Sequence, residues 1–123
     1  MSAPTTVEAV RLALDLNELR ARVAGSNIAN ASQPGATAQQ VDFSQVEAAL
    51  RNAAAATDGV EAGRWLATAR DALGRVVPDS DGSAVQLDRE VAEMAGASLQ
   101  YQALTEALGR QFGLMRIAIA GRT

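Results

Sequence analysis

The last third of the chain, Val85 to Ala120, contains no proline and carries apolar residues at regular intervals. Spacings of three and four residues place these side chains on one stripe of an α-helix. Such a helix would be roughly 50 Å long, which is more than the core of so small a chain can cover. The stripe therefore needs a partner helix, from this chain or from another subunit. Its members are Val91, Met94, Tyr101, Leu104, Leu108, Phe112, Met115 and Ile119, with Ser98 in the one gap.

The N-terminal segment is predicted to supply that partner, as a helix over about residues 6–29 that Thr5 or Thr6 caps. Two such helices lying side by side would bury both stripes. The predicted fold is therefore all-α, with long N- and C-terminal helices packed as an antiparallel coiled-coil-like pair. The apolar positions of the N-terminal helix, at steps of four, three and four, are Leu12, Leu16, Leu19 and Val23.

The middle of the chain is predicted to be short and partly irregular. Asp42 is expected to cap a short helix that runs through an alanine tract to Thr57, where Asp58-Gly59 stops it. A second short helix is predicted over Val60–Leu73, with Trp65 as a packing anchor or an interface plug. The chain then divides into an N-terminal part, a middle segment and a C-terminal helical part, over residues 1–35, 36–82 and 83–123.

Composition excludes several kinds of function. The 123 residues include no Cys, hence no disulfide or thiolate chemistry, and no His, the commonest general base and metal ligand. A net charge of −3 argues against a surface for nucleic acid or for acidic membranes. No apolar run reaches membrane-spanning length, and the N-terminus has no features of a cleavable signal peptide. Because no nucleophile–base pair or zinc spacing occurs either, we predict no catalytic residue, metal, cofactor or small-molecule substrate.

One acidic pattern is similar to a calcium-binding loop. Asp79, Asp81, Ser83 and Glu90 fall at four of its ligand positions. The position that needs Gly for the sharp turn is Ala84, so we interpret the pattern as an acidic turn followed by an acidic first helical turn.

Residues 25–35 combine small side chains, two asparagines and a Pro-Gly pair. In one interpretation they are a frayed helix end followed by a turn. In the other, the Asn27 and Asn30 amides hydrogen-bond to backbone groups and hold neighbouring segments close together. Local chemistry leaves both interpretations open.

The same residues carry a resemblance to a known family. The run Ser26-Asn27-Ile28-Ala29-Asn30-Ala31, followed by Pro34-Gly35, resembles the SNIANA-x-x-PG signature of the axial proteins of the bacterial flagellum. The later Val41-Asp42-Phe43 is similar to a motif that follows the signature in proximal rod proteins of the FlgB type.

The C-terminal part resembles the same type of rod protein. The segment GSAVQLDRE over residues 82–90 is similar to the start of the closing helix in those proteins, and residues 98–103 and 108–112 are similar to its continuation. The resemblance covers about residues 10–45 and 80–120 and leaves the middle unmatched.

The resemblance implies a structural subunit of the flagellar basal-body rod, located in the periplasm and exported without a cleaved signal peptide through the flagellar type III apparatus. The expected partners are copies of itself, other rod proteins and the membrane-ring junction. The alternative is a soluble helical-hairpin adaptor or export-chaperone-like module that binds a partner helix. The expected assembly interface comprises Leu12, Leu16, Leu19, Val23, Ser26, Asn27, Ile28, Asn30, Tyr101, Leu104, Leu108, Phe112, Met115 and Ile119.

Overall fold

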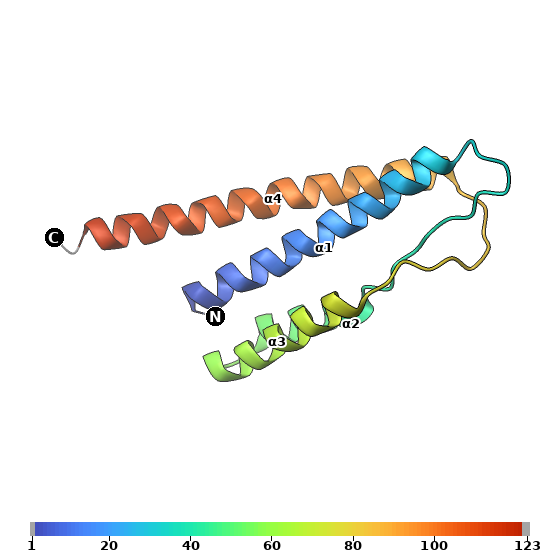
Figure 1. Ribbon diagram of the computed structural model, residues 1–123. Coiled ribbons are helices and arrows are strands. Elements are labelled where there is room, and N and C mark those ends of the chain that lie inside the picture. The colour runs from blue at the N-terminus through green and yellow to red at the C-terminus, as the bar shows by residue number, and fades with distance from the viewer. Residues whose placement is uncertain (1, 122–123) are drawn as a thin grey trace.

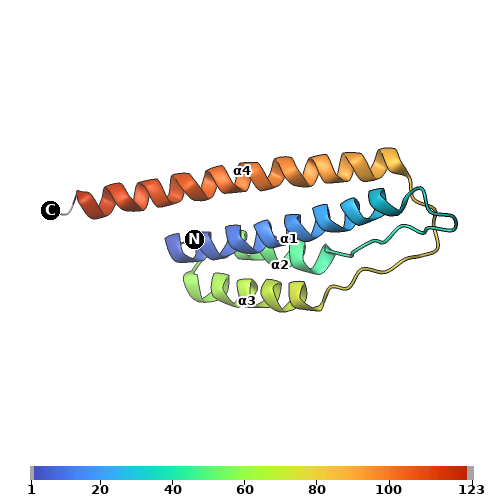
Figure 2. The ribbon, with the colours of Figure 1, turned by 45° about the horizontal axis from the view of Figure 1, so that its top comes forward.

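The computed structural model describes residues 2–121, apart from the side chain of Ala3, and its regular elements are helices. The two long helices, α1 and α4, run antiparallel and side by side (Figure 1). The two short helices, α2 and α3, pack on each other below α1, so that α1 lies between them and α4 (Figure 2). The predicted all-α fold with an antiparallel terminal pair is confirmed. The bounds are α1 Ala3–Asn30, α2 Ser44–Ala55, α3 Gly59–Arg75 and α4 Leu87–Ala120.

Helix α1 begins three residues earlier than predicted. The Ser2 side chain caps it by accepting a hydrogen bond from the backbone N–H of Thr5. The hydroxyls of Thr5 and Thr6, which were the predicted caps, instead donate to the carbonyl oxygen of Ser2 at 2.9 Å. Pro4 fits this arrangement because the first turn of a helix needs no N–H from it.

The two short helices also differ from prediction at their ends. Phe43, not Asp42, occupies the cap position of α2, and this helix ends at Ala55 rather than Thr57. Asp58 does not stop α2 but caps α3, where its Oδ1 accepts from the N–H of Glu61 at 2.7 Å. An aspartate before a glycine suits both a helix stop and a helix start, and here its side chain selects the start.

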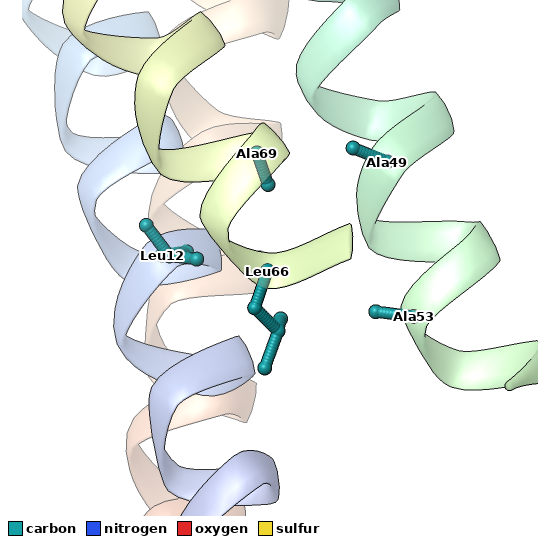
Figure 3. Close-up of a cluster of buried hydrophobic side chains, with 5 residues drawn as sticks. All are labelled: Leu12, Ala49, Ala53, Leu66 and Ala69. Carbon is teal, nitrogen blue, oxygen red and sulfur yellow. The ribbon is translucent and has the colours of Figure 1, made fainter. Parts of the chain in front are cut away.

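The core lies between α1 and the α2–α3 hairpin. Leu12 of α1 and Leu66 of α3 meet a row of alanines that allows the helices to approach closely; Figure 3 shows the cluster of Leu12, Ala49, Ala53, Leu66 and Ala69. The half-buried Trp65 packs against this cluster, which agrees with its predicted role as a packing anchor. A second cluster joins Leu16, Phe43 and Val46.

Helix α4 remains largely exposed because α1 covers it on one side only (Figure 2). Ala97 is the one buried apolar residue of α4, and Leu104 and Leu108 are half-buried. The expectation that pairing with the N-terminal helix would bury both stripes is therefore wrong for α4. Its large exposed apolar side chains are Leu87, Val91, Met94, Leu99, Tyr101, Phe112, Leu114, Met115, Ile117 and Ile119.

We predict that Leu66→Ala lowers the free energy of unfolding by about 2–5 kcal/mol, because it leaves a cavity in the core that the surrounding residues fill only partially. Urea denaturation followed by circular dichroism measures the change. Leu99→Ala is the matched control on α4: the side chain is 67% exposed, so its effect should stay within about 0.5 kcal/mol. Equal effects of the two substitutions would contradict a core centred on α1, α2 and α3.

Candidate assembly surface

The end of α1 is tied to the following segment by Asn27. This side chain is 2% exposed. Its Nδ2 donates to the Gln39 carbonyl oxygen at 2.9 Å, and its Oδ1 accepts from the Gln39 N–H at 2.8 Å. The amide therefore pairs with an extended backbone as a neighbouring strand would. The interpretation of this stretch as a frayed helix end followed by a turn is half right: α1 continues unbroken to Asn30, and the turn follows it at residues 31–35. The other interpretation holds for the Asn27 amide, whereas Asn30 is exposed and its side chain makes no hydrogen bond among the described residues.

The segment that Asn27 holds also pairs with the loop before α4. Ala38 N–H donates to Ser83 O at 2.8 Å, and Gln40 and Asp79 exchange hydrogen bonds of 2.7 and 2.8 Å between N–H and carbonyl groups. The chain reverses between α1 and this segment at Pro34-Gly35, where Gly35 has φ 75°, a conformation that other L-residues rarely adopt. Asn27 thus fixes where both loops, and through them the start of α4, lie relative to α1.

A second polar connection joins α1, α2 and α4 at Arg20. Its Nη2 lies 2.6 Å from Oε1 of Glu47, its Nε lies 3.4 Å from Oε1 of Glu93, and its guanidinium lies 5.1 Å from the centre of the Phe43 ring. Sequence reasoning missed this residue. The signal was present, because Arg20 lies four residues after Leu16 and three before Val23, on the apolar side of α1.

The structure places the predicted interface residues of α1 in three settings. Leu12 and Leu16 are buried in the core of the single chain, and so is Asn27 in its backbone pairing. These three are already covered within the single chain. Half-buried members are Leu19, Val23 and Ile28, and exposed members are Ser26 and Asn30.

The predicted interface residues of α4 divide between a covered side and an open one. Leu104 and Leu108 follow Ala97 at helical spacing on the side that faces α1. The others continue the same stripe of α4 but are exposed, and we call these exposed members the α4 flank. Its members, at steps of 3, 4, 7 and 11 residues, are Val91, Met94, Tyr101, Phe112, Met115 and Ile119.

The described residues offer little for other kinds of site. Across residues 2–121, no group of three or more Asp or Glu side chains could hold a metal ion. None of the helices in this range is long and apolar enough to cross a membrane. The dominant surface feature is therefore the α4 flank.

Comparison with known proteins decides the family. Over 89% of its length the chain is 36% identical to the flagellar basal body rod protein FlgB of Yersinia enterocolitica, of which the alignment covers 90%. It is 34% identical to FlgB of Salmonella typhimurium and 33% identical to FlgB of Escherichia coli, with 89% of each chain covered. The chain belongs to the FlgB family. No family model matches it.

Membership of the FlgB family confirms the resemblance that the SNIANA-x-x-PG motif and the C-terminal helix indicate. In this FlgB family member two residues of the motif have a clear structural role: Asn27 pairs with the Gln39 backbone, and Gly35 allows the turn. The relatives align across most of the chain, so the middle segment that the motifs left unmatched also belongs to this family.

We predict that Asn27→Leu lowers the free energy of unfolding by about 1–3 kcal/mol, because the half-buried Gln39 N–H and C=O would then lose their partners. Urea denaturation and hydrogen exchange at the Gln39 amide measure the loss. Asn30→Leu is the matched control, three residues away and exposed, and should stay within about 0.5 kcal/mol. Equal stability of both variants would contradict the role of Asn27.

A pH-dependent contribution is expected from Asp42. Hydrogen bonds from the Ser44 side chain and backbone hold the pKa of this exposed carboxyl below its ordinary value. A carboxyl whose pKa is lower in the folded state stabilises the fold above the unfolded pKa of about 3.9 and loses that contribution as the pH falls through the folded pKa. Asp42→Asn should therefore flatten the decline of stability below about pH 4. An NMR titration with Asp42 at or above its ordinary pKa would refute this expectation.

Proposed function

We propose that this chain is a structural subunit of the flagellar basal body rod, without catalytic activity, and that its copies associate through the α4 flank. The observation that carries the proposal is the uncovered apolar strip along most of a 34-residue helix. Monomeric proteins rarely expose large apolar patches, and such patches commonly mark protein–protein contacts.

Magnitudes support a contact that covers many flank residues at once. Complete burial of one large apolar side chain contributes about 1.5–3 kcal/mol, whereas association costs about 4–15 kcal/mol in lost motional freedom. One or two flank residues could not offset that cost. Six residues along one helix could, provided that the partner surface is also a long helix.

A long helix that its own chain covers only in part suits a rod. Within the chain α1 covers Ala97 and half covers Leu104 and Leu108 of α4, and the flank can receive a different surface of the next copy. Contacts between different surfaces repeat around an axis and build an open helical assembly, whereas a contact of one surface with itself closes as a dimer. In this proposal the α1–α4 pair forms the inner part of the rod, and the segment that contains α2 and α3 forms a small outer part.

Further partners belong to the same proposal. Neighbouring rod proteins with similar terminal helices would offer equivalent surfaces to the two ends of a stack of copies, and the membrane-ring junction would receive one end. The flagellar type III export apparatus would deliver the chain to the periplasm. The absence of Cys suits an oxidising compartment, because no thiol can be oxidised there.

We predict that Phe112→Ser combined with Ile119→Ser abolishes swimming in a strain whose own rod protein is deleted. The two side chains are 47% and 68% exposed, so the isolated monomer should keep its circular dichroism spectrum and thermal midpoint. Leu104→Asp or Leu108→Asp should also abolish swimming, but with loss of monomer stability, because these residues are half-buried.

The control is Ile117→Ser, which changes an equally exposed apolar residue two positions before Ile119, on another side of α4. It should swim normally. Normal swimming of the Phe112/Ile119 double variant would refute the flank as the assembly surface. Isolation of the chain with soluble export clients, but not with basal bodies, would favour the adaptor or chaperone-like alternative.

A further inference from the structure

A cavity of about 380 Å³ lies where α1, the segment 39–44 and the first turns of α4 meet. Its lining combines four carboxylates with two guanidinium groups, so its formal charge is −2. These groups belong to Asp42, Glu47, Glu90, Glu93, Arg20 and Arg89. The positive charge of Arg20 is already shared between Glu47 and Glu93.

Glu90 is the unusual member of this lining. It is only 9% exposed, and in the described part of the chain no hydrogen bond or ion pair reaches its carboxylate. Its oxygens nevertheless retain contact with solvent, since the one enclosed and unpartnered side-chain atom is Oδ1 of Asn17. A buried carboxylate is expected to have a cationic or hydrogen-bonding partner. The amino end of α4 offsets part of its burial, but it provides no direct partner for the side chain.

A negatively charged cavity favours a cationic partner, and the spacing of its carboxylates favours a side chain over a metal ion. The carboxylates are not grouped closely enough to hold a metal. A guanidinium has five N–H donors in a planar fork and can bridge acceptors that are separated in this way. Another copy of this chain can supply only guanidinium groups from its side chains, because none of its eleven basic residues is Lys.

One arginine is placed to be that group. Arg116 lies four residues after Phe112 and three before Ile119, and so on the α4 flank. It is exposed, and no ion pair engages it among the described residues. By contrast, Arg110 pairs with Glu106 and lies two residues before Phe112, away from the flank.

The charges of α4 support the same contact. Asp88, Glu90 and Glu93 lie in its first two turns together with one cation, Arg89, whereas the charged residues that follow Glu106 in its described part are Arg110 and Arg116. This distribution of charge also stabilises an isolated helix through its dipole, so by itself it is not evidence for a contact between two copies. Contact between the end of one α4 and the start of another would bring opposite charges together.

We propose that the Glu90 cavity is a receptor for the guanidinium of Arg116 from a second copy of this chain. This proposal rests on the self-association proposed above. The Glu90–Arg116 pair would set the register in which two copies meet. It implies that Glu90 is retained at a cost to the isolated monomer, since its carboxylate stays unpaired until assembly.

The first test uses the monomer and does not depend on assembly. Argininamide should shift the amide signals of Glu90 and Glu93 in the NMR spectrum, whereas citrullinamide, its neutral isostere, should not. Glu90→Gln should abolish the response and raise the thermal midpoint. Two results would show that the cavity is not a guanidinium site. In the first, citrullinamide shifts the wild-type signals as much as argininamide does. In the second, the Glu90→Gln variant still responds to argininamide.

The second test asks whether Arg116 is the partner. Glu90→Gln and Arg116→Gln should each weaken self-association, measured by sedimentation, by about tenfold or more, as for loss of one member of a desolvated charge pair. The double variant should be no weaker than either single variant. Arg110→Gln, the control, should change association less than about twofold.

Additive losses in the double variant would overturn the Glu90–Arg116 pair. If the wild-type chain does not self-associate at all, the proposed assembly fails and the pair fails with it. The argininamide response would still decide whether the cavity binds a guanidinium, so the two failures are distinguishable.

Discussion

The structure depends on α1 having two covered sides. Leu12 and Leu16 are buried against α2, α3 and Phe43, while the neighbouring side of the same helix receives α4. A helix with one apolar stripe can pack that stripe against one neighbour, whereas α1 packs against two. Because the α2–α3 hairpin takes the leucine stripe of α1, less apolar surface is left for α4, and α4 stays exposed along its flank.

Polar groups fix how these helices are arranged. Burial of apolar surface is not directional, so it holds α1 against the hairpin without fixing where the connecting segments run. Asn27 does that by pairing with Gln39, and Arg20 links α1 to Glu47 of α2 and Glu93 of α4. Removal of Asn27 would leave the half-buried Gln39 backbone groups without partners, and removal of Arg20 would leave Glu47 without its ion pair. These two residues are therefore more specific to this arrangement than any one leucine.

The exposed flank promotes non-specific association of an isolated chain, and the same property is needed by a rod subunit for assembly. A monomer with many large apolar side chains in water is prone to association, and a subunit of a rod is required to associate. Membership of the FlgB family places the chain among basal body rod proteins. The proposed partner for Glu90 fits the same logic, because this largely buried side chain has no hydrogen bond or ion pair among the described residues.

The sequence by itself determined the helices and the family. Spacings of three and four residues are local and need no partner, so the two long helices and the segment around Trp65 could be predicted. Helix ends were less predictable: several side chains could act as caps, and Ser2 and Asp58 were selected by geometry. Only the tertiary structure decided which neighbour covers each stripe, that Asn27 meets Gln39, and that Arg20 and Glu90 border one cavity. The physical reason is that periodicity reports which side of a helix is apolar, whereas its partner depends on how the loops reverse the chain.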